Sequence, residues 1–143
     1  MHVQAADTPA EDFRWSARVY WEDTDASGVV YHAGYLRFME RARTEWLRSV
    51  GVGQRARLEA GQPVFAVRRM TLDFHAPARL DDLLSVTVGA ARVRGASMDF
   101  TQRVCREDGS LLVSAAVQVV CIDARFRPVR LPLDLLENFP NGV

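Results

Sequence analysis

The hydrophobic period of the chain changes, and this change separates a helical part from an extended part. From His32 to Val50, apolar residues recur every three or four positions, which is the period of an α-helix with one buried face. Charged residues, mostly arginine and glutamate, occupy the opposite face, and Gly51 supplies a C-terminal stop. The pattern predicts one long amphipathic helix of about five turns.

Apolar and polar residues alternate along several other stretches, as in strands with one buried face. Five such stretches are present, one before the helix and four after it: 14–22, 64–75, 83–93, 96–106 and 111–122. Short helices are predicted at 52–61 and 133–139. This order favours an α+β fold in which an antiparallel five-stranded sheet wraps around one long helix. Because long strands leave edges and faces to cover, we expect a homo-oligomer, either a dimer or a tetramer.

Composition adds limits to this picture. The 143 residues suit one domain, at 13–143, preceded by a flexible polar extension at 1–12. Eighteen arginines balance eighteen acidic residues, so the overall charge predicts binding to neither nucleic acid nor anionic membrane. The sequence has no lysine, which excludes a Schiff-base mechanism. No apolar run is long enough for a membrane span and no signal sequence is present, so we expect a cytoplasmic protein with reduced Cys105 and Cys121.

The stretch between the first strand and the long helix concentrates the residues that can carry chemistry. It reads YWEDTDASGVVYHAGY from position 20 to position 35. Asp25 lies just before a turn that Gly28 permits, and the helix begins just after this turn. A helix N-terminus offers unpaired backbone N–H groups and a partial positive charge. A carboxylate and donors that stabilise an anion can therefore face one small site.

Residues 18–48 and 64–84 closely resemble the hotdog-fold acyl-CoA thioesterases associated with the Tol-Pal system, the YbgC type, which are similar in turn to 4-hydroxybenzoyl-CoA thioesterase. The resemblance covers roughly residues 14–139, and the D-x-D-x-x-G-x-V-x-H arrangement at 23–32 is specific. It implies a hotdog fold, active sites at subunit interfaces, hydrolysis of acyl-CoA thioesters and Asp25 as the catalytic carboxylate. Ser27 stands where such motifs often have glycine, and a serine fits most turns.

Thioester hydrolysis needs a nucleophile or an activated water, together with hydrogen-bond donors at the carbonyl oxygen. We expect Asp25 to attack directly or to act as a general base, and the backbone N–H groups of Tyr31 and His32 to be the oxyanion donors. Asp25 has a rival interpretation, because aspartate also caps turns and helices. The His32 ring could pack, orient Asp25 or a water, or protonate the leaving thiolate. Ser27 is a poor nucleophile candidate, since DASGVV is not a G-x-S-x-G elbow.

Coenzyme A also carries phosphates, which arginine side chains bind well. The candidates are Arg94 and Ser97 beside the Gly95 turn, and the pair Arg68 and Arg69, which strand alternation sends to opposite faces. Each arginine could instead be an ordinary solvated residue of the sheet. The three histidines and two cysteines are far apart in sequence, so we predict no metal ion and no cofactor beyond the substrate.

Three functions are compatible with these features. The first is an acyl-CoA thioesterase, which could also accept acyl groups from acyl carrier protein. The second is a non-catalytic protein that binds acyl-CoA or acyl carrier protein as a scaffold of the cell-envelope machinery, since fold alone does not determine function. The third is a hydratase or dehydratase that acts on an enoyl thioester. The spacing of Asp25, Gly28 and the helix N-terminus favours the first.

Overall fold

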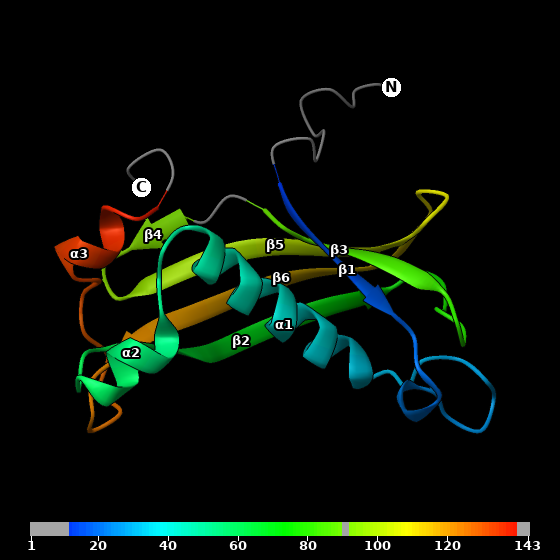
Figure 1. The fold of residues 1–143 in the computed structure, drawn as a ribbon, viewed down its shortest axis with the longest axis horizontal. Helices are drawn as coiled ribbons and strands as arrows, with labels where there is room; N and C mark the ends of the chain where they lie inside the picture. Colours follow the sequence, from blue (N-terminus) through cyan, green and yellow to red (C-terminus); the bar gives the residue numbers. More distant parts are fainter. Residues whose placement is uncertain (1–11, 90–91, 140–143) are drawn as a thin grey trace.

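The computed structural model describes residues 12–89 and 92–139, which form one curved sheet around a central helix (Figure 1). The predicted extension at 1–12 lies outside the described residues except for Asp12. The helical elements are a short 3-10 turn η2 (Trp21–Asp23), α1 (Gly34–Ser49), α2 (Gln54–Glu59) and α3 (Leu133–Leu136). The strands are β1 (Phe13–Arg18), β2 (Val64–Phe74), β3 (Leu83–Val88), β4 (Arg92–Arg94), β5 (Ser97–Arg106) and β6 (Leu111–Ile122).

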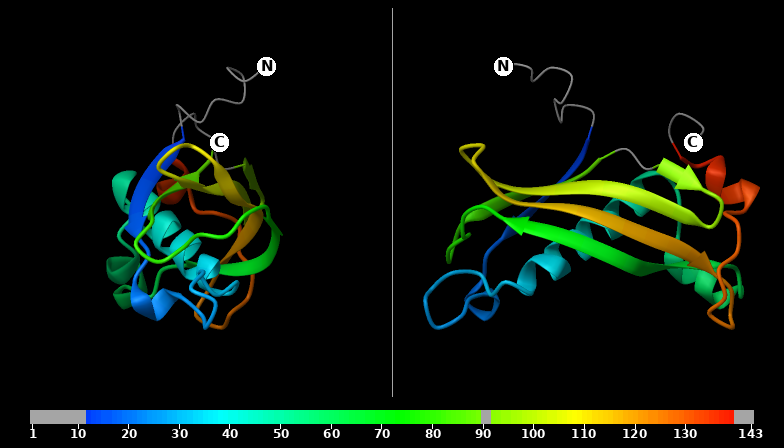
Figure 2. Two further views of the ribbon diagram at one scale, coloured as in Figure 1. Left: turned by 90° about the vertical axis from the view of Figure 1, so that its right-hand side faces the viewer. Right: turned by 180° about the vertical axis from the view of Figure 1, so that it is seen from behind.

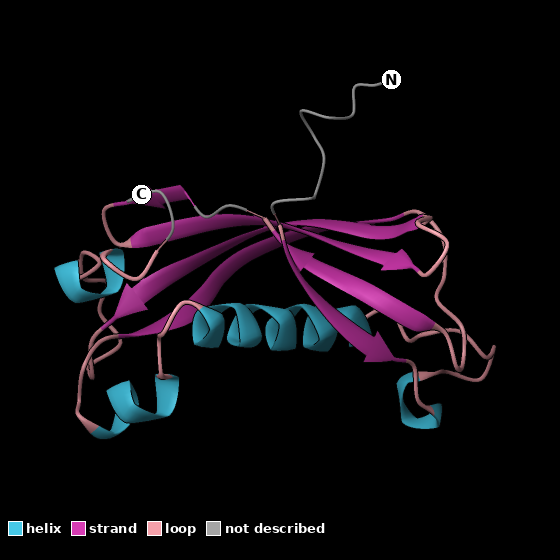
Figure 3. Cartoon of the chain, turned by 45° about the horizontal axis from the view of Figure 1, so that its top comes forward, coloured by secondary structure: helices cyan, strands magenta, loops and turns pink. Residues whose placement is uncertain are grey.

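The strands form one six-stranded sheet, in the order β1-β3-β5-β6-β2, with β4 paired to β5. Every pairing is antiparallel, and β1 and β2 are the two ends of the main order. The sheet curves around α1, which lies along its concave side, while α2 and α3 lie near one end (Figures 2 and 3). This arrangement confirms the predicted α+β hotdog fold.

The region between the first strand and the long helix is less regular than predicted. The first strand ends at Arg18 rather than at position 22, because the Asp23 carboxylate accepts the Tyr20 N–H at 2.8 Å and holds residues 21–23 in the 3-10 turn. The helix begins at Gly34, whose N–H donates to the Tyr31 carbonyl at 2.7 Å in a tight turn. Local hydrogen bonds therefore shorten both elements.

Two strands also depart from the predicted pattern. The strand predicted at 83–93 is divided into β3 and β4, so the sheet has six strands instead of five. Gly89 follows β3, and a Cβ atom there would lie 2.5 Å from the Thr101 hydroxyl oxygen, so this close approach requires glycine. In β2, the pairing with β6 shifts register between Val67 and Arg69, which is a β-bulge at Arg68.

The apolar face of α1 packs against the concave side of the sheet, and the core lies between them. Trp46 lies near the C-terminal end of α1, with ring centroids 5.3 Å from Phe100 and 5.4 Å from Phe139. The buried residues of α1 are Tyr35, Phe38, Met39, Ala42, Arg43, Trp46 and Leu47. The spacing of the apolar members is that of the predicted helical stripe, so the periodicity identified the packed face. Arg43 is the exception, because its charge predicted the polar face whereas the structure buries it.

A polar pair is buried within this apolar core. Arg43 on α1 is 6% exposed and Gln102 on β5 is 1% exposed. Arg43 Nη1 donates to Gln102 Oε1 at 2.9 Å, and Gln102 Nε2 donates to the carbonyls of Met39 at 3.2 Å and Thr87 at 3.3 Å. Burial lowers the pKa of Arg43, and the neighbouring Glu40 carboxylate opposes this shift. Gln102 therefore ties the middle of α1 to the sheet and satisfies a buried cation.

Replacing this glutamine tests its structural role. We expect Gln102→Leu, which keeps the side-chain volume, to lower the free energy of unfolding by about 2–4 kcal/mol, because it leaves the buried Arg43 Nη1 without its acceptor and removes one hydrogen bond from each of two carbonyl groups. Thr101→Val is the matched control on the exposed face of the same strand and should stay within about 0.5 kcal/mol of the parent. Urea unfolding measures both, and equal stability of the two variants would contradict the assigned role.

Candidate active site

The acidic loop before α1 forms a tight hairpin. The Asp25 N–H donates to the Val29 carbonyl at 2.9 Å, and Thr24 and Val30 form an antiparallel bridge. Gly28 closes the turn with a φ of +81°, and its N–H donates to the Asp25 carbonyl at 3.0 Å. Glycine adopts this left-handed conformation without steric penalty, so Gly28 permits the turn. The bridge thus joins Thr24, the neighbour of Asp25, to Val30, which lies four residues before the beginning of α1.

The two carboxylate oxygens of Asp25 have different surroundings. Oδ1 accepts the Ser27 N–H at 2.8 Å, which is an Asx turn that holds the hairpin. Within the described part of the chain, no partner is recorded for Oδ2, and the side chain is exposed. Turn capping and chemistry are therefore compatible in this residue, since one oxygen can fix the loop while the other meets a substrate.

Asp23, the other aspartate of the motif, is committed to structure. Its carboxylate Oδ2 accepts the Tyr20 N–H at 2.8 Å, and its carbonyl accepts the Tyr31 N–H at 3.0 Å. These two bonds join the 3-10 turn to the second arm of the hairpin. Asp23 thus stabilises the loop that carries Asp25.

The N-terminus of α1 offers fewer oxyanion donors than expected. Since the Tyr31 N–H is bonded to the Asp23 carbonyl, it is not available in this conformation, and this predicted donor does not fit the structure. Neither His32 nor Ala33 has a backbone partner for its N–H among the described residues. The available donor of the predicted pair is His32, and Ala33 is a further donor that sequence reasoning missed. A helix boundary two residues later than predicted explains both changes.

A hollow of about 600 Å³ opens beside these donors. Its walls are mostly aromatic and come from the start of α1 and the end of β2. Phe74 lies with its ring centroid 6.5 Å from that of His32 and 5.9 Å from that of Tyr35. Burial raises the pKa of Tyr35, whose hydroxyl accepts the Ala78 N–H at 3.0 Å, so this phenol stays neutral. The lining residues are Val30, His32, Tyr35, Phe74, His75, Ala76 and Pro77.

His75 is a second imidazole on the wall of this hollow. Its Nε2 lies 3.0 Å from the Ser114 hydroxyl oxygen. In the sequence His75 has no partner pattern, because the nearest polar side chain comes from a strand 39 positions away. The sequence pattern does not show that β2 pairs with β6. This pairing places Asp73 opposite Ser114 and so brings His75 within reach of that serine.

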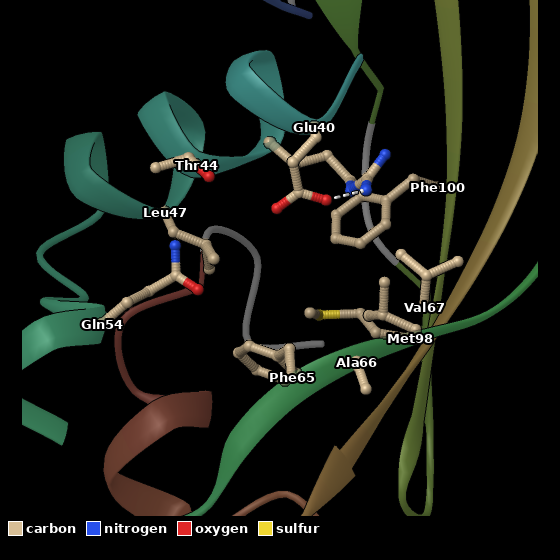
Figure 4. Close-up of a pocket in the computed structure, with 11 residues that line it drawn as sticks. Glu40, Thr44, Leu47, Gln54, Phe65, Ala66, Val67, Met98 and Phe100 are labelled. Atoms are coloured by element: carbon tan, nitrogen blue, oxygen red, sulfur yellow. Dashed lines mark hydrogen bonds and ion pairs between the residues drawn. The ribbon is translucent and has the colours of Figure 1, made fainter. Parts of the chain in front are cut away.

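A more enclosed pocket of about 400 Å³ lies farther along α1, between this helix and the sheet (Figure 4). Its apolar wall includes Phe65, Met98 and Phe100, and its polar wall includes Glu40, whose carboxylate pairs with Arg43. The pocket joins a mainly apolar floor to a fixed ion pair.

The four residues predicted to meet phosphates fall into two neighbouring hollows. Arg68, Arg94 and Ser97 line one of about 930 Å³, and Arg69 and Arg94 line another of about 890 Å³. Strand alternation would have separated Arg68 from Arg69 by a whole face, but the bulge in β2 breaks the alternation at this point. Arg94 pairs with Asp99 at 3.0 Å, whereas Arg68 and Arg69 have no hydrogen bond or ion pair among residues 12–89 and 92–139.

Residues 12–89 and 92–139 contain neither a cluster of metal ligands nor a helix that could span a membrane. No group of three or more histidine, cysteine, aspartate or glutamate side chains there could hold a metal ion. None of the helices described has both the length and the apolar character needed to cross a membrane. Cys105 and Cys121 are free, and burial raises the pKa of both thiols.

Comparison with known proteins identifies the family. The thioesterase-like superfamily matches residues 19–139. The chain is 49% identical to "Acyl-CoA thioester hydrolase YbgC" of Escherichia coli O6:H1, over 89% of this chain and 95% of the relative. It is 44% identical to "Acyl-CoA thioesterase YbgC" of Haemophilus influenzae, over 89% and 93%. A probable thioesterase from Bartonella henselae superposes with a TM-score of 0.79 at 40% identity, over 85% and 99%. The chain therefore belongs to the thioesterase-like superfamily and is a relative of the YbgC acyl-CoA thioesterases.

Proposed function

We propose that this protein hydrolyses acyl-CoA thioesters to a free acid and coenzyme A. Two relatives at 49% and 44% identity are named for this reaction, and they match nearly their whole length. The observation that carries the proposal is the Asp25 hairpin, where one carboxylate oxygen holds the loop and the other is unengaged. It lies beside a helix start at which the His32 N–H has no backbone partner among the described residues.

The proposed reaction uses these groups on one carbonyl. The thioester carbonyl oxygen accepts a hydrogen bond from the His32 N–H, and the N-terminal dipole of α1 stabilises the negative charge that develops. The free oxygen of Asp25 either attacks the carbonyl carbon, which gives an anhydride that water then opens, or removes a proton from an attacking water. In both routes the C–S bond breaks and the sulfur leaves as a thiolate. No metal ion or additional cofactor has a role in this scheme.

The substrate also has a nucleotide end, for which we propose Arg68, Arg69, Arg94 and Ser97 as contacts. These residues come together in two adjoining hollows, and two of the arginines have no recorded partner among the described residues. Acyl carrier protein presents its acyl group on the same phosphopantetheine arm, so we propose it as an alternative acyl donor. We place the protein in the cytoplasm, where coenzyme A esters occur and where free cysteines such as Cys105 and Cys121 persist.

We further propose that two chains pair through β2. This strand ends the sheet and has one neighbour, β6, among the described strands, so its second edge is unpaired. Apolar side chains are exposed along it and beside it, with Val67 at 44%, Phe74 at 55% and Leu36 of α1 at 40%. Pairing of two β2 edges would cover these side chains and continue the sheet. The hollow lined by Phe74 would then lie at the subunit interface.

Asp25 provides the first test. We expect Asp25→Asn to lower kcat by about 10²–10⁴-fold, because the amide keeps the hydrogen bond to Ser27 but can neither attack nor accept a proton. Ser27→Ala is the matched control in the same turn and should keep the activity of the parent, since its side chain is not assigned to the reaction. Thiol release from short, long-chain and aromatic acyl-CoAs measures both variants. Equal release by the parent and Asp25→Asn would refute the assignment, and no release by the parent from any acyl-CoA would refute the proposed function.

A substitution at His32 distinguishes the role of its backbone N–H from that of its imidazole ring. We expect His32→Ala to lower kcat by less than about tenfold, because it keeps the N–H and because a coenzyme A thiolate leaves without strong acid assistance. The dependence of kcat on pH should keep its shape. A loss of 10²-fold or more, accompanied by a changed pH profile, would show instead that the ring transfers a proton.

The proposed dimer can be tested at Val67. We expect Val67→Asp to weaken self-association, because it would bury a carboxylate in the paired β2 edges. Leu133→Asp on α3 is the control, since this leucine is 75% exposed and belongs to a helix outside the sheet. Sedimentation should find the parent and the control at a multiple of the 16.0 kDa chain mass. A monomeric parent, or identical masses for all three proteins at low concentration, would contradict pairing through β2.

A further inference from the structure

A solvent-exposed phenylalanine lies beside the arginines of the first hollow. Phe126 is 81% exposed and lines the same hollow as Arg68, Arg94 and Ser97. Single exposed apolar side chains are common on protein surfaces, so what distinguishes Phe126 is its position at the rim of a hollow that two arginines line. The remaining wall is mostly apolar and is formed by Ala96, Val120, Ile122 and Pro128.

The loop that carries Phe126 holds the backbone of this residue in a fixed conformation. Phe126 has a φ of +63°, a left-handed conformation that is rare for a bulky residue. The conformation is imposed by Asp123, whose Oδ1 accepts the N–H groups of Arg125 at 2.9 Å and Arg127 at 3.0 Å. The Phe126 N–H itself donates to the Asp123 carbonyl at 2.9 Å. A strained residue held by its surroundings often serves a functional purpose.

The groups around the hollow match the chemistry of a nucleotide. Arginine forks bind phosphate oxygens, and Arg68 has no recorded partner within the described chain. A flat aromatic ring stacks on a nucleobase without requiring hydrogen bonds. We propose that the face of Phe126 stacks on the adenine of coenzyme A while Arg68 and Arg94 bind its phosphates. This inference rests on the proposed thioesterase function and adds a residue that recognises the substrate at a distance from the reacting carbonyl.

The nucleotide hollow and the thioester hollow of one chain lie at different places along the sheet, and their separation determines which subunit binds the nucleotide. Phe74, at the thioester end, pairs with Val113 on β6, and Ile122 of the same strand lines the nucleotide hollow. The nine residue-to-residue steps from Val113 to Ile122 span roughly 30 Å. Figure 1 shows the same separation, with the loop after β6 and the acidic loop at opposite ends of the molecule. One chain therefore places its two substrate-binding ends far apart.

Antiparallel pairing of two β2 strands would remove this separation. β2 begins at Val64, near the nucleotide hollow, and ends at Phe74, beside the thioester hollow. In an antiparallel pair, the beginning of one strand lies opposite the end of the other. The partner subunit's Phe126 would thus approach the acidic loop of this chain, and each site would take its carbonyl chemistry from one subunit and its adenine contact from the other.

Removing the ring tests the adenine contact. We expect Phe126→Ala to raise KM for an acyl-CoA about tenfold at unchanged kcat, because one stacking contact is lost. KM for the acyl-pantetheine with the same acyl group, which lacks the nucleotide, should not change. Phe126→Trp should restore the KM of the parent for acyl-CoA. An unchanged KM for acyl-CoA in Phe126→Ala, or an equal rise for both substrates, would overturn the proposal.

Mixed dimers test the assignment to the partner subunit. In a co-expressed dimer of Asp25→Asn and Phe126→Ala chains, a shared site combines the intact Asp25 of one chain with the intact Phe126 of the other. We expect such dimers to show the KM of the parent at about half its kcat per dimer, since one of two sites is complete. The raised KM of Phe126→Ala in the mixed dimers would overturn the shared site.

Direct binding separates this inference from the proposed function. If the parent releases thiol from neither acyl-CoA nor acyl-pantetheine, the hydrolase proposal fails, and the nucleotide contact can still be measured. Calorimetry with adenosine 3′,5′-bisphosphate should then show about tenfold weaker binding to Phe126→Ala than to the parent. Equal binding, or no binding to the parent, would overturn the adenine contact on its own.

Discussion

The site depends on one constraint, which is that the acidic hairpin and α1 are both hydrogen-bonded to the same buried residue, Ala78. Ala78 is 0% exposed and lies between β2 and β3. Its N–H donates to the Tyr35 hydroxyl at 3.0 Å, and its carbonyl accepts the Val30 N–H at 2.8 Å. Movement of either partner would leave a buried backbone group without a hydrogen bond, which costs about 1–3 kcal/mol. The hairpin that carries Asp25 and the first turn of α1 are therefore held in a fixed relation.

The middle of α1 is attached in a second way, and the two attachments fix the helix about its own axis. Tyr35 binds Ala78 at the first turn, and Arg43 binds Gln102 eight residues later, on the same buried face. Apolar packing alone would tolerate small rotations of the helix, whereas these directional bonds do not. The direction of the His32 N–H follows from this constraint, because the helix start cannot turn independently of its buried stripe. The buried hydrogen bonds of Tyr35 and Arg43 thus influence the direction of a backbone donor at the surface.

Much of the fold followed from periodicity, while the errors arose where local hydrogen bonds or long-range pairing decided the outcome. The stripe of α1 and the strands β2, β5 and β6 follow directly from the spacing of apolar residues. The occupied Tyr31 N–H could not be predicted, because it depends on the pairing across the hairpin. The prediction that Arg68 and Arg69 lie on opposite faces assumed strict alternation, and the bulge in β2 interrupts this alternation. His75 and Phe126 gain their meaning from residues that only the folded sheet brings near them.

The separation of the two ends of the substrate site gives the proposed dimer a chemical reason in addition to a physical one. Exposed apolar residues along β2 would favour association in any case, because burial removes them from water. Coenzyme A adds a second requirement, since its thioester and its adenine would meet hollows at opposite ends of β6 in one chain. A two-fold pairing through β2 satisfies both requirements with the same contact. The edge strand would then position the substrate as well as join the subunits, so a variant that abolished pairing should lose nucleotide recognition together with its partner.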